Sequence, residues 1–208
     1  SAQVFLNTFT GSVRSATLSA FVASSSTYAL GMKTDRMDVW LRSFNSYRAQ
    51  KQRLKPAQRI TTEANVDPIL FSTTNLTGDF IRVGYGDATI CLLPLKTGGS
   101  KEVGALLTEL SSTTATVDAR TSGTLKEQHK FLFSALYGWF FSDLGTPSWT
   151  INDEVLAIAP NAKILEVYMS EIGLGKTWDA MEAFDPLSEA LNKADHLTFA
   201  TSLKGFTE

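Results

Sequence analysis

The stretch LKEQHKFLFSALYGWFFS, residues 125–142, is dense in aromatic side chains and decides which fold class the sequence predicts. A helix formed by these residues would carry apolar side chains on nearly every side, which is typical of a helix buried in a core. The same aromatic residues could instead stack on nucleic-acid bases or contact a protein partner. Because an aromatic run at helical spacing usually fills a core, we expect a central buried helix over about 125–142.

A β-hairpin is the second clear element. DFIRVGY (79–85) and ATICLLPL (88–95) are separated by Gly86-Asp87, and a glycine at the centre of a two-residue turn accepts the positive φ that tight hairpins need. A lone hairpin is only marginally stable in water, so it must pack against other elements. The sequence therefore predicts a mainly α fold of the α+β class: a helical bundle around the 125–142 helix, with the 79–95 hairpin packed against it.

The length of 208 residues, with 43% hydrophobic residues, suits one large domain. We see no repeat and no linker, so the sequence predicts a single domain over 1–208. Residues 1–12 are expected to form an extended N-terminal arm. SSTTATVDARTSGT, residues 111–124, is small and polar, and it predicts a flexible loop that is either functional or a simple connector.

Positive charge is concentrated between residues 35 and 59. No acidic residue occurs between Asp38 and Glu63, although the whole chain has a net charge of −2. The cations of this stretch are Arg42, Arg48, Lys51, Arg53, Lys55 and Arg59.

A helix explains the first part of this basic stretch. Met37, Trp40, Leu41, Phe44 and Tyr47 fall on one face at 3.6 residues per turn, and Thr34 is a candidate N-cap. Pro56 is expected to end the helix, and an extended basic segment is expected to follow. We call the basic end of this helix and the segment after it the basic prong. Its charge suits binding to a nucleic-acid backbone, and the alternative is a helix end that is simply solvated.

The C-terminal third has the opposite charge. From Thr150 onward the chain has ten acidic and four basic residues. This part could contact the basic prong of a neighbouring copy. Arg120, in the predicted 111–124 loop, is a further candidate contact to nucleic acid.

SEIGLGKT, residues 170–177, resembles the phosphate-binding motif of chromatin-remodelling helicases, and the resemblance extends only to Ala180. It implies backbone amides around a phosphate, Lys176 on the outer phosphates and Thr177 on magnesium. However, Ser170 occupies the position of the first glycine, and only 31 residues follow Thr177. We therefore favour a simple turn, in which Gly173 ends one helix, Gly175 turns the chain and Thr177 caps the next helix.

Catalytic and cofactor signatures are otherwise missing from the sequence. His129, His196 and the single Cys91 have no metal-ligand spacing, and there is no Gly-x-Ser-x-Gly motif. We therefore expect no enzyme activity, no metal and no cofactor. The single cysteine fits a reducing compartment, and no apolar run reaches the length of about 18 residues that crosses a membrane.

These observations predict a structural protein that binds single-stranded RNA through its phosphates, without reading the sequence, and that associates with itself. Its size, low charge and Ser/Thr content resemble those of helical plant-virus coat subunits, which implies heterologous contacts between copies and a location in the cytoplasm or the virion. A nucleotide-binding enzyme using 170–177 and a protein-interaction module using the aromatic stretch remain the alternatives.

Overall fold

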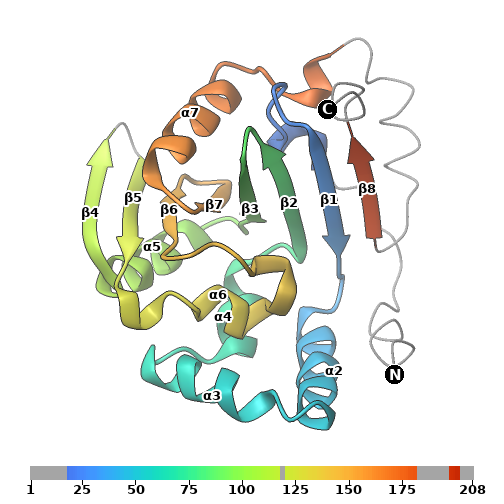
Figure 1. Cartoon of the computed structure of the whole chain (residues 1–208), viewed down its shortest axis with the longest axis vertical. Coiled ribbons are helices and arrows are strands. Elements are labelled where there is room, and N and C mark those ends of the chain that lie inside the picture. The colour runs from blue at the N-terminus through green and yellow to red at the C-terminus, as the bar shows by residue number, and fades with distance from the viewer. Residues whose placement is uncertain (1–17, 118–119, 182–196, 202–208) are drawn as a thin grey trace.

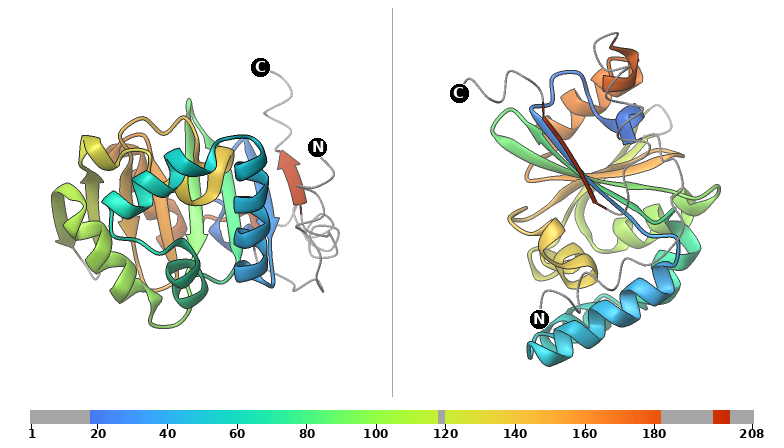
Figure 2. Two further views of the ribbon diagram at one scale, coloured as in Figure 1. Left: turned by 90° about the horizontal axis from the view of Figure 1, so that it is seen from below. Right: turned by 90° about the vertical axis from the view of Figure 1, so that its right-hand side faces the viewer.

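The computed structural model describes residues 18–117, 120–181 and 197–201, and its central element is an antiparallel β-sheet. The eight strands lie in the order β4-β5-β6-β7-β3-β2-β1-β8. Helices pack on both faces, which gives three layers (Figures 1 and 2). The expectation of a mainly α helical bundle is therefore wrong. The fold is α+β, with a sheet rather than a helix at its centre.

The strands are β1 (Tyr28–Lys33), β2 (Asp79–Tyr85), β3 (Ala88–Pro94), β4 (Ser111–Val117), β5 (Arg120–Leu125), β6 (Ser148–Ile151), β7 (Val155–Ala159) and β8 (Leu197–Thr201). The α-helices are α2 (Met37–Gln50), α3 (Leu54–Glu63), α4 (Pro68–Asn75), α5 (Gly99–Glu109), α6 (Leu132–Tyr137) and α7 (Ala162–Gly173). Short 3-10 helices are η1 (Leu18–Phe21), η2 (Glu127–His129), η3 (Gly138–Phe141) and η4 (Trp178–Ala180).

The predicted hairpin is present as β2 and β3, and it lies inside the sheet rather than beside a bundle. Gly86 has φ of 54° in the turn, a conformation that glycine adopts without strain. Pairing with β1 on one side and β7 on the other satisfies the backbone groups of both strands. Successive side chains point to opposite faces, and both faces are covered. This explains why β3 is apolar without interruption from Ile90 to Leu93.

The larger core lies on the face covered by α2, α5, α6 and η3. Phe80 of β2 is fully buried there, and its ring packs against four others: Trp40 at 5.4 Å, Tyr137 at 5.0 Å, Phe140 at 6.3 Å and Phe141 at 6.1 Å between centroids. These rings come from α2, α6 and η3. Aromatic packing therefore fixes the position of this helical layer on the sheet.

A smaller core lies on the opposite face, beneath α7, η1 and η4. Ile81 and Val83 of β2 meet Leu165 and Tyr168 of α7 in this cluster. Tyr168 donates a hydrogen bond to the Phe21 carbonyl at 2.5 Å, which ties α7 to η1. Asn161 caps α7 by accepting a hydrogen bond from the Ile164 amide.

The 125–142 stretch does not form one helix. Leu125 ends β5, η2 follows, α6 has six residues, and η3 begins at Gly138. Gly138 has φ of 80°, and a Cβ there would lie 2.5 Å from Cζ of Phe44. Most of the aromatic residues are buried as predicted, but the helix ends at Tyr137, because the positive φ of Gly138 is not helical.

The 111–124 segment is also not a loop. It forms most of the β4–β5 hairpin at one edge of the sheet, and residues 118–119 lie outside the described part. Thr and Val favour the pleated conformation, and an exposed edge strand does not need bulky apolar residues. The predicted arm over 1–12 lies outside the described residues, and a single domain over 1–208 stays a prediction.

The buried core position of Phe140 gives a stability prediction. Phe140→Ala should lower the free energy of unfolding by about 3–5 kcal/mol, because it removes a ring packed against Phe80 and leaves a cavity. Urea denaturation monitored by circular dichroism measures this change. Leu174→Ala is the control: its side chain is 68% exposed, so the loss should stay within about 0.5 kcal/mol. Equal losses in the two variants would contradict this packing.

Candidate nucleic-acid interface

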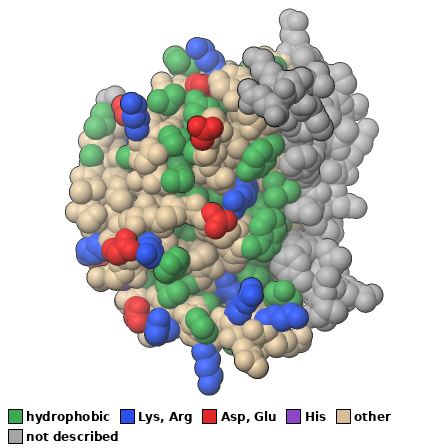
Figure 3. Space-filling view, in the orientation of Figure 1, with side chains coloured by type: hydrophobic (Ala, Val, Ile, Leu, Met, Phe, Trp, Pro, Cys, Tyr) green, Lys and Arg blue, Asp and Glu red, His purple; other side chains and the backbone are tan. Residues whose placement is uncertain are grey.

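A group of exposed cations lies where α2 ends and α3 begins. Its members are Arg42, Lys51, Arg53, Lys55 and Arg59, which we call the basic surface. Figure 3 shows Lys and Arg side chains gathered on the lower part of the molecule, over these helices. Arg59 pairs with Glu63 at 3.6 Å, whereas within the described residues the other four have no ion pair. Of these four, Arg42 lies close enough to Asp38 to help lower the pKa of that carboxyl, whereas Lys51, Arg53 and Lys55 form no ion pair with a described residue.

The backbone of the basic surface differs from the prediction. α2 ends at Gln50, and Gln52 has φ of 56°, so the chain turns before Pro56. Pro56 lies in the first turn of α3, where a missing N–H costs no helical hydrogen bond. The predicted extended segment after Pro56 is therefore helical. The cations project from two consecutive helices and the turn between them.

Arg48 is not part of the basic surface. It is buried, and its guanidinium donates hydrogen bonds to the carbonyls of Ala135 at 2.5 Å and Ser134 at 2.8 Å. It also lies 4.1 Å from the centroid of the Phe44 ring. Burial lowers the pKa of Arg48 to about 10. This side chain closes the end of α6 and has no nitrogen directed at a solvent-borne phosphate.

The spacing of Arg48 could have signalled its burial. It follows Phe44 by four residues and Leu41 by seven, so it continues the apolar stripe of α2. A cation at that position is expected to be buried with hydrogen-bonding partners rather than solvated. The prediction that Arg48 contacts nucleic acid therefore overlooked its position on the buried face of α2.

Arg120 lies apart from the other predicted contacts. Its Nη2 atom is 2.7 Å from the position that a Cβ of Gly173 would occupy, at the end of α7. α7 packs on the sheet face opposite α2 and α6. The seven predicted residues therefore divide into five on the basic surface, one buried and one on another face.

Two exposed aromatic side chains lie just outside the two ends of α6, and we call Phe131 and Trp139 the aromatic pair. Their exposed fractions are 55% and 54%, while the other three tryptophans are at most 4% exposed. Phe131 lies one turn before Ala135, which Arg48 anchors to α2. Trp139 follows Gly138, which contacts Phe44 of α2. Arg48 and Phe44 of α2 thus contact the backbone between these two residues, at Ala135 and Gly138.

Charges around the aromatic pair are partly compensated. Lys130 lies 5.1 Å from the centroid of the Phe131 ring and also bonds to Glu127. Hydrogen bonds from Lys130 and then Thr146 lower the pKa of Glu127. Sequence reasoning assigned all these aromatics to the core. The exposure of Phe131 and Trp139 was not predicted, because the prediction of one buried helix over 125–142 placed every aromatic side chain of this stretch in the core.

The 170–177 segment lacks the context of a phosphate-binding loop. ILEVYM before it belongs to α7 rather than to a strand, and the helix after it, η4, has three residues. Gly175 has φ of 68°, and Thr177 precedes η4. The arrangement is helix, turn and short 3-10 helix, as in the simpler interpretation, but the Thr177 side chain donates a hydrogen bond to Asp179 and does not cap η4.

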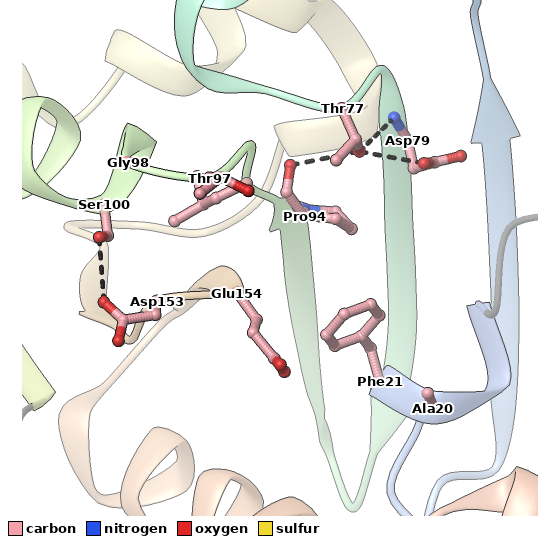
Figure 4. Close-up of a pocket in the computed structure, with 11 residues that line it drawn as sticks. Ala20, Phe21, Thr77, Asp79, Pro94, Thr97, Gly98, Ser100, Asp153 and Glu154 are labelled. Carbon is pink, nitrogen blue, oxygen red and sulfur yellow. Dashed lines mark hydrogen bonds between the residues drawn. The ribbon is translucent and has the colours of Figure 1, made fainter.

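A cavity of about 750 Å³ lies where β2 begins and β3 ends (Figure 4). Its acidic lining residues are Asp79, Asp153 and Glu154, and Ser100 donates a hydrogen bond to Asp153 at 3.2 Å. No Lys, Arg or His appears among the described residues that line it. Three carboxylates repel phosphate, so this cavity is not suited to a nucleic-acid backbone.

Cys91 is not suited to act as a nucleophile. This thiol is fully buried, and burial raises its pKa to about 12. Because the thiolate is the reactive form, Cys91 is inert at neutral pH. In the described residues, no group of three or more His, Cys, Asp or Glu side chains could hold a metal ion.

Comparisons with known proteins do not assign the chain to a family. No protein-family model matches the chain, and neither the curated proteins nor the solved structures gave a match. Among the helices of the described residues, none combines the length and apolar character needed to cross a bilayer. Any function must therefore be argued from the geometry alone.

The burial of Arg48 predicts that its substitution destabilises the protein more than substitution of the exposed cations does. Arg48→Ala should lower the free energy of unfolding by about 1.5–3 kcal/mol, because two carbonyls lose a charged donor. Arg48→Lys should restore only part of this loss, since an ammonium lacks the planar fork that reaches both carbonyls. Denaturant titration provides the measurement.

The control is Arg42→Ala, at an exposed position of the same helix, which should change stability by no more than about 0.5 kcal/mol. A harmless Arg48→Ala variant would show that the guanidinium is free in solution and available to ligands.

Proposed function

We propose that this protein binds single-stranded nucleic acid, RNA in particular, through the basic surface and the aromatic pair, as a structural component of an assembly in the manner of a capsid or nucleocapsid subunit. The observation that carries the proposal is the set of exposed cations without an ion pair on α2, α3 and the turn between them, together with two half-exposed aromatic rings at the ends of α6, which Arg48 joins to α2. Cations bind the phosphates, and rings stack on bases that are not paired.

Binding of this kind does not depend on sequence. Arg42, Lys51, Arg53 and Lys55 are long, exposed side chains on α2, α3 and the turn between them, where they meet a phosphate backbone more readily than base edges. Stacking on Phe131 and Trp139 accepts any base, because every base has a π-face. A duplex buries its bases and would use only the cations, so single strands are the favoured ligand.

Self-association fits the charge balance. The net charge of the chain is −2, so one copy holds a polyanion only through its local basic surface. Several copies along one strand add their contacts and bind it far more strongly than one copy does. Location in the cytoplasm or a virion follows from this proposal. A protein partner on the aromatic pair is the competing outcome, and the experiments below distinguish it.

The salt dependence of binding tests the basic surface. With four phosphate contacts, the slope of log K against log salt should be about −3 for a single-stranded homopolymer, at about −0.7 per contact. The variant with Gln at positions 42, 51, 53 and 55 should have a slope near zero and a much lower affinity. Fluorescence anisotropy of labelled oligo(U) and oligo(A) measures both.

A matched control replaces four cations elsewhere, Lys96, Lys101, Lys163 and Lys176, with Gln. This variant has the same change in net charge, and it also removes the lysine of the 170–177 motif. An identical fall in affinity in both variants would mean that bulk charge, rather than the basic surface, determines binding.

Stacking on the aromatic pair gives a separate prediction. Trp139→Ala should weaken single-strand binding by about 1–3 kcal/mol and leave the salt slope unchanged, because it removes a stacked base but no phosphate contact. Oligo(U) should also quench the fluorescence of Trp139, the exposed tryptophan, in the wild-type protein. Val167→Ala, at an exposed apolar position of α7, should alter neither quantity. Unchanged affinity in Trp139→Ala would leave these rings to a protein partner.

A further inference from the structure

The outer edge of the sheet at β4 is unpaired in the described part of the chain. β4 bonds to β5 on one side, and Figure 1 shows no described element beyond it. Six of its seven residues, from Ser112 to Val117, are exposed. Alternate residues of an edge strand direct their N–H and C=O groups away from the sheet, where another strand can pair with them.

Natural edge strands are usually protected against such pairing, and β4 has little protection. Its sequence SSTTATV contains no charged residue, no proline and no glycine. A register irregularity is present, but it is confined to Ser111 and Thr113, so Thr113–Val117 pairs regularly with β5. Lysine, proline or a central bulge is the common device for blocking an edge. Five regular residues therefore remain open to pairing.

We propose that β4 pairs in antiparallel fashion with the β4 strand of a second copy of this chain, centred on Thr114. In this register Thr113 lies opposite Ala115 of the partner, and Ser112 lies opposite its Thr116. All these side chains are small and neutral, so the pairing brings no like charges together and has no steric conflict. A charged peptide would find no opposite charge on β4, which is why an identical neutral strand is the occupant.

The layers of the fold are compatible with this pairing. A two-fold axis perpendicular to the sheet reverses the strand direction and keeps each face on its own side, so both copies of α5 lie on the same face. α5 leads directly into the Ser111 end of β4. A hollow of about 380 Å³, lined in part by Thr116, Thr121 and Gly104, lies on the same face toward the other end of β4. The axis places the C-terminal end of each α5 near the Thr116 end of the partner's β4, on the face that carries the partner's hollow.

This contact is isologous and closes with two copies, whereas stacking along a nucleic acid requires heterologous contacts. It does not depend on the proposed nucleic-acid binding, because β4 is separate from the basic surface. A dimer formed in this way would join two sheets into one and give each particle two basic surfaces. Tests on nucleic-acid-free protein keep the two proposals distinguishable.

Disulfide trapping tests the contact directly. Opposed residues of antiparallel strands have Cα atoms about 4.5–5.5 Å apart, within the range that a disulfide bridges. Thr114→Cys should therefore form a covalent dimer under mild oxidation. Cys91 is buried with a raised pKa and should not compete. Thr74→Cys, at an exposed site on α4, is the control and should stay monomeric on a non-reducing gel.

Charge substitutions at the centre of the register provide the second readout. Thr114→Lys or Thr114→Glu should each raise the dimer dissociation constant about fivefold or more, the equivalent of about 1 kcal/mol from like charges facing each other. Mixing the two variants should restore the dimer, because Lys then faces Glu. Analytical ultracentrifugation measures all three samples, and melting curves verify folding.

The proposal is overturned if wild-type protein stays monomeric at high concentration and Thr114→Cys forms no more dimer than Thr74→Cys. Association that survives both charge variants, with no gain on mixing, would likewise exclude β4 as the contact. The salt dependence of RNA binding should be the same for Thr114→Lys as for the wild-type protein. Loss of the dimer can then be told apart from loss of RNA binding.

Discussion

The packing of Phe80 against four aromatic rings is the interaction on which the arrangement of this molecule depends. Phe80 lies in a strand that is buried on both faces, and the rings around it come from α2, α6 and η3. Because this contact fixes α2 on the sheet, it also fixes where α2 ends and where the basic surface begins. Arg48 then joins α2 to α6 through two carbonyls. The helices that carry the cations and the aromatic pair are therefore joined in one layer on this face of the sheet.

Local pattern predicted the elements whose structure depends on neighbours in sequence. The β2–β3 hairpin was predictable because Gly86-Asp87 specifies the turn and the flanking residues suit strands. The apolar stripe from Met37 to Phe44 likewise predicted the buried face of α2. In both cases the decisive spacing lies within a few residues, so no knowledge of distant contacts was needed.

The failures have tertiary causes. An unbroken helix over 125–142 was wrong because Leu125 pairs in the sheet as the last residue of β5 and because Gly138, with φ of 80°, leaves the helical conformation where Phe44 packs against it. A loop over 111–124 was wrong because an exposed strand at a sheet edge can be built from Thr and Ser without apolar anchors. Of the predicted site residues, the cluster on α2 and α3 could be found from charge alone. The burial of Arg48 could have been found from its spacing on the apolar stripe of α2, whereas the position of Arg120 and the exposure of Phe131 and Trp139 could not be found from local pattern.

Three surfaces of distinct character result: a basic and aromatic layer, an acidic cavity and a neutral sheet edge. The central claim is that single-stranded nucleic acid lies on the first of these. Ultraviolet cross-linking of the purified protein to oligo(U), with adducts located by mass spectrometry, tests it most directly. The account predicts adducts on Phe131 or Trp139 and on peptides from 51–59. Adducts confined to the acidic cavity around Asp153, or no adducts at saturating oligonucleotide, would contradict it.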